Sequence, residues 1–216
     1  MCITKKDHFN DLMDYVNSRL IHRELEKKQN GEVFTTLELI NGAVPKLSIT
    51  KKENKLGMLD HLPKEVWTNP NLKWLDPANG IGNFPICVYY RLMKGLAKCK
   101  ELLDKDERSR HIINNMLYMV ELDQVNADVS RSVFCGDGIT PNIYQGDFLK
   151  ADLKKVFGVD KFDVVMGNPP YQKKVGPKKT QAIWNLFVKK SLNLLKNEGY
   201  LLFIHPSGWR GPTGNF

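Results

Sequence analysis

Five short apolar segments alternate with stretches of helical periodicity, and this alternation restricts the fold more than any other feature. The segments are residues 72–76, 116–123, 142–147, 162–168 and 200–205. Short apolar and β-branched runs predict buried strands, and strands that alternate with helices are typical of a doubly wound sheet. We therefore expect an α/β fold with a mostly parallel sheet of five strands, preceded by a helical segment.

The region before the first strand predicts two helices. Apolar residues recur at helical spacing over residues 7–28: Phe9, Leu12, Met13, Val16 and Leu20. Asn30-Gly31 would end that helix, a second helical stretch starts at Thr36 and ends near Val44, and the Lys-rich residues 50–55 should be exposed. We expect two parts, an N-terminal amphipathic helix (1–30) and a core (31–216).

Composition limits the class of protein. The chain has 216 residues, of which 42% are hydrophobic and 26% charged, as in an ordinary globular domain. We find no apolar run long enough for a membrane span and no secretory signal, so we expect an intracellular protein. The cysteines are widely spaced, without His partners at zinc-ligand intervals. We predict reduced thiols and no metal site.

Asn168-Pro169-Pro170-Tyr171 follows the apolar run 162–167 and should lie at the carboxyl end of a strand. Open α/β sheets bind their ligands at that edge. Two consecutive prolines stiffen the backbone and donate no hydrogen bonds, which places an amide, a rigid carbonyl and an aromatic ring side by side. A strand-ending turn is the alternative interpretation.

Residues 76–84 leave the first strand and enter a helix, with Asn83 as a candidate cap and Pro85 in the first turn. Gly80 and Gly82 would let the backbone approach a ligand at the helix start. The third glycine of the dinucleotide fingerprint is missing, and an anionic Asp76 would repel pyrophosphate but attract an ammonium group or steady a sulfonium.

The second and third strands also end in carboxylates. Glu121 is placed to accept hydrogen bonds from both ribose hydroxyls, and the nearby Asp123 is expected to cap a helix. Asp147 could accept from an adenine amino group while Phe148 stacks on the ring, although an Asp at a strand end is also a common helix cap. The ligand therefore resembles an adenosine with an amino-acid tail.

The formal net charge is +8, and residues 172–198 contribute seven lysines against Glu198 alone. A lysine-rich stretch beside a candidate site suits a polyanionic partner, because lysines that neutralise phosphates release counterions. The alternative interpretation is a solvated face on a basic protein. The lysines are Lys173, Lys174, Lys178, Lys179, Lys189, Lys190 and Lys196.

These segments together resemble the S-adenosylmethionine-dependent DNA adenine-N6 methyltransferases, from about Gly31 to Arg210. The ordered set is Phe34-Thr35-Thr36, residues 76–84, Glu121, Asp147-Phe148 and Asn168-Pro-Pro-Tyr171. The resemblance implies a Rossmann-like methyltransferase fold, S-adenosylmethionine as cofactor and DNA as partner, with a role in a restriction-modification or other DNA-modification system.

The order of the segments is similar to the gamma arrangement, in which the target-recognition region follows the catalytic core. In that family the first Thr of the Phe-Thr-Thr element helps hold the methionine carboxylate, which implies that role for Thr35. This chain has Thr36 where Pro is usual and Asn79 where Cys is common. Asp76 and Glu121 lie 45 residues apart, so we expect a helical insertion around residues 97–114.

Methylation of adenine fits the tetrapeptide. The exocyclic nitrogen is a poor nucleophile that develops positive charge during transfer, so the site must supply acceptors. The Asn168 side-chain oxygen and the Pro169 carbonyl can each accept one N–H of that amino group. The base must flip out of a duplex to reach them, and Tyr171 offers a face on which it can stack.

The sheet implied by the resemblance has seven strands, whereas five are predicted, so we expect a core that is incomplete after the fifth strand. A missing C-terminal target-recognition domain or a second polypeptide would complete it. An uncovered edge beside residues 201–204 would favour self-association, and a clean monomer in sedimentation would argue against both expectations.

Three alternatives remain. Asn-Pro-Pro-Tyr also occurs in enzymes that methylate protein glutamine or RNA adenine. A non-catalytic nucleic-acid-binding subunit could keep the fold and bind the cofactor without turnover. A nicotinamide oxidoreductase on a similar sheet is disfavoured by the missing third glycine.

Overall fold

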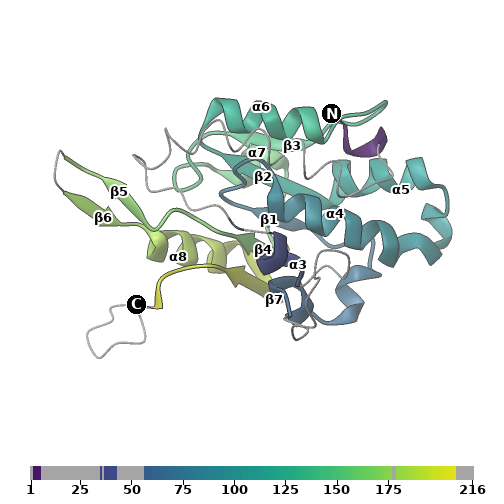
Figure 1. Cartoon of the computed structure of the whole chain (residues 1–216), viewed down its shortest axis with the longest axis horizontal. Coiled ribbons are helices and arrows are strands. Elements are labelled where there is room, and N and C mark those ends of the chain that lie inside the picture. The colour runs from purple at the N-terminus through teal and green to yellow at the C-terminus, as the bar shows by residue number, and fades with distance from the viewer. Residues whose placement is uncertain (1, 6–34, 36, 43–55, 177–178, 208–216) are drawn as a thin grey trace, which may run out of the picture.

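Five parallel strands form the central sheet of the computed structural model (Figure 1), which describes residues 2–5, 35, 37–42, 56–176 and 179–207. The strand order is β3-β2-β1-β4-β7. All four pairings in this sheet are parallel, so the predicted doubly wound fold is confirmed. The strands are β1 (Trp74–Asp76), β2 (Leu117–Glu121), β3 (Asn142–Gln145), β4 (Phe162–Gly167) and β7 (Leu195–Phe203).

Helices follow the strands, as the periodicity predicts. The α-helices are α3 (Leu37–Asn41), α4 (Asn83–Gly95), α5 (Lys105–His111), α6 (Gln124–Val133), α7 (Leu153–Phe157) and α8 (Trp184–Leu194). Short 3-10 segments are η1 (Ile3–Lys5), η2 (Met58–His61), η3 (Lys64–Trp67), η4 (Leu96–Lys98) and η5 (Lys100–Leu102), and η6 (Ile112–Met116) is a π-helix. Segments η4 to η6 confirm the expected helical insertion.

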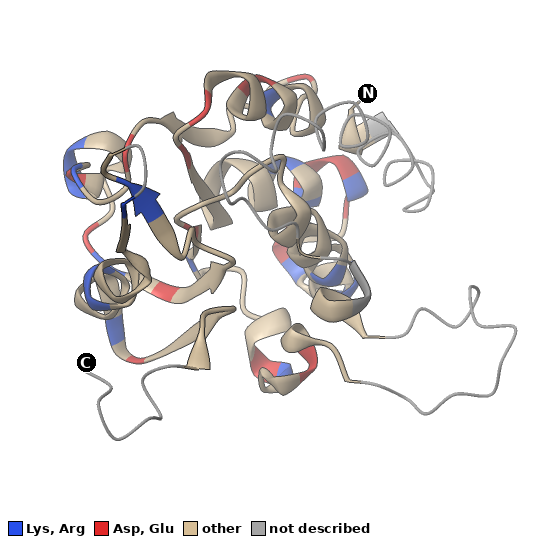
Figure 2. Cartoon of the chain, turned by 60° about the vertical axis from the view of Figure 1, so that its left-hand side comes forward, with Lys and Arg blue, Asp and Glu red and all other residues tan. Residues whose placement is uncertain are grey.

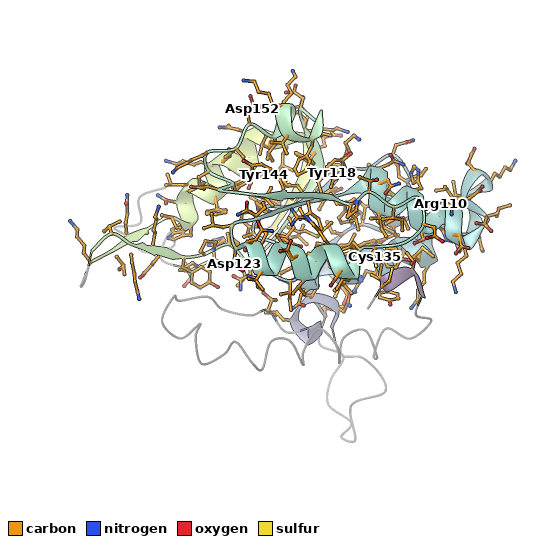
Figure 3. All side chains as sticks on the ribbon, turned by 90° about the horizontal axis from the view of Figure 1, so that it is seen from above. Arg110, Tyr118, Asp123, Cys135, Tyr144 and Asp152 are labelled. Atoms are coloured by element: carbon orange, nitrogen blue, oxygen red, sulfur yellow. The ribbon has the colours of Figure 1, made fainter. Side chains whose placement is uncertain are left out.

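The sheet separates two apolar clusters, because successive residues of a strand point to opposite faces. Trp74 packs into the cluster that contains α4 residues such as Ile86, and Leu75 into the cluster that contains Leu153 of α7 and Phe187 of α8. Seen from above (Figure 3), Asp123 at the start of α6 and Asp152 at the start of α7 lie on opposite sides of the sheet. The result is a three-layer sandwich in which the central strands β1, β2 and β4 are largely buried on both faces.

The start of α4 differs from the prediction. Its N-cap is Gly82, with φ +100°, and not Asn83. The Asn83 amide instead donates from Nδ2 to the Thr35 carbonyl at 3.2 Å. Pro85 lies in the first turn, as predicted, where the backbone N–H has no helical partner to lose.

Residues 172–182 form a hairpin that the sequence pattern did not predict. Strand β5 (Gln172–Lys174) pairs antiparallel with β6 (Thr180–Ala182), and the hairpin projects away from the main sheet in Figure 1. All six strand residues are exposed. An exposed hairpin needs no alternation of apolar and polar residues, so it leaves no such pattern in the sequence.

Strand β7 forms one edge of the main sheet, where the uncovered edge was expected. Tyr200–Phe203 pairs with Val164–Gly167, but the strand starts earlier than predicted because Leu195 also pairs with Phe162. The register shifts between these two pairings, and Glu198 in the intervening segment has φ +64°.

Most of the predicted N-terminal region lies outside the described residues. This applies to the helix over 7–28, to Phe34 and Thr36, to residues 50–55 and to the last nine residues of the chain. Within the second predicted helix, α3 covers Leu37–Asn41. The division into residues 1–30 and 31–216 stays a prediction.

Candidate active site

The carboxyl ends of β1, β2, β3 and β4 open onto one cavity of about 630 Å³. Its wall contains Thr35 and residues from all four strand ends: 77–81, 121–123, 146–149 and 168–174. This volume is within the usual range for a cofactor or small-ligand site. Four segments that lie far apart in the sequence therefore meet at one place, as the parallel sheet requires.

The two glycines of the first loop have different roles. Gly80 has φ +58° and Gly82 φ +100°, which are backbone conformations that favour glycine. A Cβ added to Gly80 would meet no atom within 4 Å, whereas one added to Gly82 would lie 3.2 Å from the Phe134 ring. Gly80 thus leaves room on the cavity wall, and Gly82 allows α4 to start against α6.

Glu121 joins two loops beneath the cavity. Its Oε2 accepts from the Gly80 N–H at 2.6 Å, and its Oε1 accepts from the Asp123 N–H at 2.8 Å. The side chain is 8% exposed and lines the cavity. A carboxylate oxygen has more than one acceptor position, so an oxygen that accepts from the backbone can also accept from a ligand hydroxyl.

Asp123 caps α6, as predicted. Its Oδ1 accepts from the Asn126 N–H at 2.9 Å. Figure 3 labels Asp123 at one end of α6 and Cys135 at the other.

Asp76 is buried at the end of β1, and its predicted role beside an ammonium or sulfonium group stays a prediction. The residue is 1% exposed, and its Oδ1 accepts from the Ala78 N–H at 3.0 Å. Burial raises the pKa of Asp76 to about 8, with Glu121 adding to the rise and the Ala78 hydrogen bond opposing it. The hydrogen bond from Ala78 means that the Asp76 side chain holds the start of the first loop.

Asp76 also lies against the end of β4. A Cβ at Gly167, whose φ is +150°, would come within 2.7 Å of Asp76 Oδ1. The first loop and the tetrapeptide are therefore packed together through a glycine and a buried carboxyl group.

Asp147 and Phe148 line the opposite wall. Asp147 Oδ1 accepts from the Leu149 N–H at 2.9 Å, which forms a local turn. The Phe148 ring is 2% exposed and stacks on Phe187, with 5.3 Å between ring centroids. Stacking of Phe148 on adenine stays a prediction, and Phe187 already occupies part of its surface.

Thr35 comes from a distant segment but lies at the same cavity. It is buried, and its carbonyl is held by Asn83 at the start of α4. The Thr35 backbone is therefore held at the start of α4, and the role that the resemblance implies for this residue stays a prediction.

The tetrapeptide is anchored at both ends. The Gly167 carbonyl accepts from the Ile204 N–H at 3.1 Å, and the Tyr171 carbonyl accepts from the Ile183 N–H at 3.0 Å. Pro169 is buried, Asn168 and Tyr171 are partly buried, and all three line the cavity. Burial raises the pKa of the Tyr171 phenol, so the ring stays neutral at physiological pH.

The described lysines of the lysine-rich stretch have different surroundings. Lys173, Lys174 and Lys179 are exposed on the hairpin, and the two lysines of β5 colour that strand blue in Figure 2. Lys190 instead donates to backbone carbonyls, and Lys196 lies 2.9 Å from the Asp163 carboxylate.

Lys189 is exposed on α8, and Lys178 lies outside the described residues.

Asn79 and Ser130 form a contact that sequence reasoning missed. Asn79 Nδ2 donates to Ser130 Oγ at 2.7 Å and to the Gly80 carbonyl at 3.0 Å. Both residues are buried, so this bond ties the glycine loop to α6. Position 79 stands out because it holds Asn where Cys is common in the family that the chain resembles. Nothing in the sequence indicated Ser130 as the partner of Asn79.

Within the described part of the chain, no three or more His, Cys, Asp or Glu side chains gather where they could hold a metal ion. The helices described there are also too short or too polar for any to cross a bilayer.

Comparison with known proteins identifies a family for more than half of the chain. Residues 102–215 match the family model described as "Eco57I restriction-modification methylase". This match covers β2, β3, β4 and β7, and with them the carboxylates and the tetrapeptide of the cavity.

Relatives cover more of the chain. An adenine-specific methylase of Mycoplasma pneumoniae, described as uncharacterized, is 28% identical over 83% of this chain and 56% of its own length. The type II methyltransferase M.VspI of a Vibrio species is 28% identical over 72% of this chain and 35% of its own length. The chain thus spans about half or less of the length of these relatives.

A solved structure supports the fold. A modification subunit assigned to a type I restriction enzyme from Vibrio vulnificus YJ016 superimposes with a TM-score of 0.59 at 18% identity. The match covers 93% of this chain and 39% of that subunit.

Proposed function

The chain belongs to the Eco57I restriction-modification methylase family, and we propose on this premise that it transfers a methyl group from S-adenosylmethionine to the N6 amino group of adenine in DNA. The observation that carries the proposal is the single cavity, in which Glu121 and Asp147 face the same space as Asn168. A nucleoside-binding wall and an amide that can receive an amino group lie together there. We place the reaction in a DNA-modification system inside the cell.

The residues present fit the cofactor. The empty space beside Gly80 leaves room for a ligand against the backbone, and Glu121 has acceptor capacity for ribose hydroxyls. Thr35 would hold the methionine carboxylate, and Asp147 the adenine amino group. When bound, S-adenosylmethionine supplies an activated methyl group on a sulfonium.

Asn168 and Pro169 would supply the acceptors for the target amino group. A buried amide oxygen and a rigid carbonyl need little reorganisation as positive charge develops on the nitrogen, and such preorganised dipoles contribute much of the rate enhancement in many enzymes. Placement of the nitrogen in line with the methyl group also contributes to the rate enhancement. No strong base is needed before attack, because the amino proton becomes acidic once the nitrogen is alkylated.

Sequencing that detects modified bases tests the function. We expect N6-methyladenine in DNA from a host that expresses the protein with whatever further chain it needs, and far less from a host that expresses Asn168→Ala. Unmodified DNA together with intact cofactor binding would contradict the proposal. It would favour an RNA or protein-glutamine acceptor, or a non-catalytic subunit.

Tyr171→Ala is expected to weaken capture of the flipped base. Stacking of a base on an aromatic ring contributes about 1–3 kcal/mol, so KM for DNA should rise about tenfold while cofactor affinity is retained. Steady-state kinetics with a duplex substrate measures this effect. Tyr171→Phe should behave like the wild type, and an unchanged KM for DNA in Tyr171→Ala would exclude the stacking role.

The hairpin lysines are proposed to bind DNA phosphates beside the cavity. Lys173 and Lys174 line the cavity mouth, and Lys179 lies on the same exposed hairpin. Replacing all three by alanine should weaken DNA binding and flatten the dependence of log K on log salt by about 0.9 for each phosphate that is no longer neutralised. Fluorescence anisotropy over a range of salt concentrations measures both quantities.

A matched triple variant distinguishes DNA binding by the hairpin lysines from a general effect of the protein's net charge. Lys98, Lys100 and Lys105 are exposed on the insertion between α4 and β2, and replacing them removes the same charge. That variant should retain most of the DNA affinity. Equal decreases in affinity for the two triple variants would indicate a general charge effect and would remove the hairpin from the proposed interface.

We propose that the target sequence is recognised by a further segment of sequence or by a partner polypeptide, and not by the elements described here. The greater length of the relatives supports this. Base contacts determine sequence specificity, and the cavity residues account for chemistry and cofactor binding without such contacts.

A further inference from the structure

Lys190 is bound to the loop that follows β3. Its Nζ donates to the carbonyl oxygens of Phe148 at 2.6 Å, Ala151 at 2.6 Å and Leu149 at 3.3 Å. An ammonium group has three N–H donors, and here three backbone carbonyls converge on it. Lys190 is therefore part of the folded structure, unlike the exposed Lys189 beside it.

The side chain of Phe148 is held from the same helix. Phe187 and Lys190 are three residues apart on α8 and so lie on one face of it. The Phe187 ring stacks on Phe148, and Lys190 Nζ lies 5.0 Å from the Phe148 ring centroid. Helix α8 thus holds both the backbone and the aromatic ring of this loop.

The loop held by α8 is a wall of the cavity. Residues 146–149 line it, and the Asp147 carbonyl accepts from the N–H groups of Lys150 and Ala151 at 3.0 and 2.9 Å. This turn directs the next carbonyls to Lys190. Burial lowers the pKa of Lys190, and the nearby Asp147 and Asp152 carboxylates oppose that change.

The start of α8 is bound to the catalytic tetrapeptide. The Ile183 and Trp184 N–H groups donate to the Tyr171 carbonyl at 3.0 and 3.4 Å. One helix of eleven residues therefore contacts the tetrapeptide at its first turn and the Asp147 loop at Lys190.

We infer that Lys190 is a positioning residue that holds the adenine-side wall of the cofactor pocket in place relative to the Asn168 tetrapeptide. This inference rests on the proposed function, because it assigns the residue 147–149 loop to the cofactor. Lys190 touches neither cofactor nor substrate in this role. It acts through the loop carbonyls.

Lys190→Met tests the inference in the full chain. The variant keeps most of the side-chain length but removes the ammonium, so the loop carbonyls lose their donors. We expect about tenfold weaker binding of S-adenosylmethionine and S-adenosylhomocysteine by calorimetry, and a rise in KM for the cofactor that exceeds the fall in kcat. Lys189→Met, on the same helix, should keep wild-type cofactor affinity.

Two further variants distinguish positioning from folding. Lys190→Arg retains a cation that can donate to the loop and should restore most of the affinity, and Lys190→Gln should be intermediate. Circular dichroism and thermal unfolding show which variants are folded. If Lys190→Met does not fold, Lys190→Gln decides the question by the same binding measurement.

Each outcome has a defined consequence. Unchanged cofactor affinity in a folded Lys190→Met or Lys190→Gln overturns this inference and leaves the proposed function intact. Failure of both variants to fold would show a structural role alone and would also overturn it. Failure of the wild-type chain to bind cofactor would overturn the proposed function and this inference together.

Discussion

Replacing Asn168 by alanine is expected to lower kcat for adenine methylation by about 10²–10³-fold, the usual cost of removing one preorganised polar group that meets developing charge. Cofactor affinity should stay within about twofold of the wild type, because Asn168 lies at the end of β4, whereas the proposed cofactor contacts follow β1, β2 and β3. Single-turnover methylation and calorimetric titration measure the two quantities separately.

The controls for Asn168 address folding and acceptor chemistry. Asn193→Ala changes an exposed asparagine on α8 and should leave methylation unchanged. Asn168→Asp keeps an acceptor oxygen and should retain more activity than the alanine variant. Parallel decreases in kcat and cofactor affinity in Asn168→Ala would show that the residue supports the site structurally.

Replacing Glu121 by alanine is expected to weaken cofactor binding at least a hundredfold. The carboxylate is bound to Gly80 and Asp123 at 2.6 and 2.8 Å, and hydrogen bonds to charged groups contribute about 1.5–3 kcal/mol each. The variant would lose the ribose acceptors and would also free the glycine loop that Glu121 holds. Both effects act on the same binding site.

The thermal shift caused by the cofactor measures the Glu121 effect. A bound ligand stabilises the folded state by RT ln(1 + [L]/Kd), so the rise in Tm on adding S-adenosylmethionine should almost vanish in Glu121→Ala. Glu107→Gln, on the exposed side of α5, should retain the full shift. A normal shift in Glu121→Ala would exclude Glu121 as a cofactor ligand.

The sequence alone predicted the main secondary structure and the edge of the sheet at which the cavity lies. Each strand of the main sheet contains a local apolar run, and parallel strands place their carboxyl ends at one edge. Glu121, Asp147 and Asn168 were therefore predictable as neighbours despite their separation in the chain. Asp123 as a helix cap was predictable for a similar reason, since a cap depends on residues three positions apart.

The roles of single side chains were harder to predict from the sequence. Asp76 ends a strand as Glu121 does, yet it is buried against Gly167 and the first loop, while Glu121 lines the cavity. The residue pattern around each acid is similar. Their different surroundings arise from packing between strands that are distant in the sequence.

By itself, the sequence determined the alternating α/β order, the positions of the glycine loop and the tetrapeptide, and the excess of lysine after Tyr171. The tertiary structure alone decided the surroundings of those lysines. The described lysines of the hairpin are exposed, while Lys190 donates to loop carbonyls and Lys196 pairs with Asp163. Charge and periodicity are local properties that a sequence displays directly. The partner of a long, flexible side chain is decided by which distant backbone or carboxylate the fold brings within hydrogen-bonding distance.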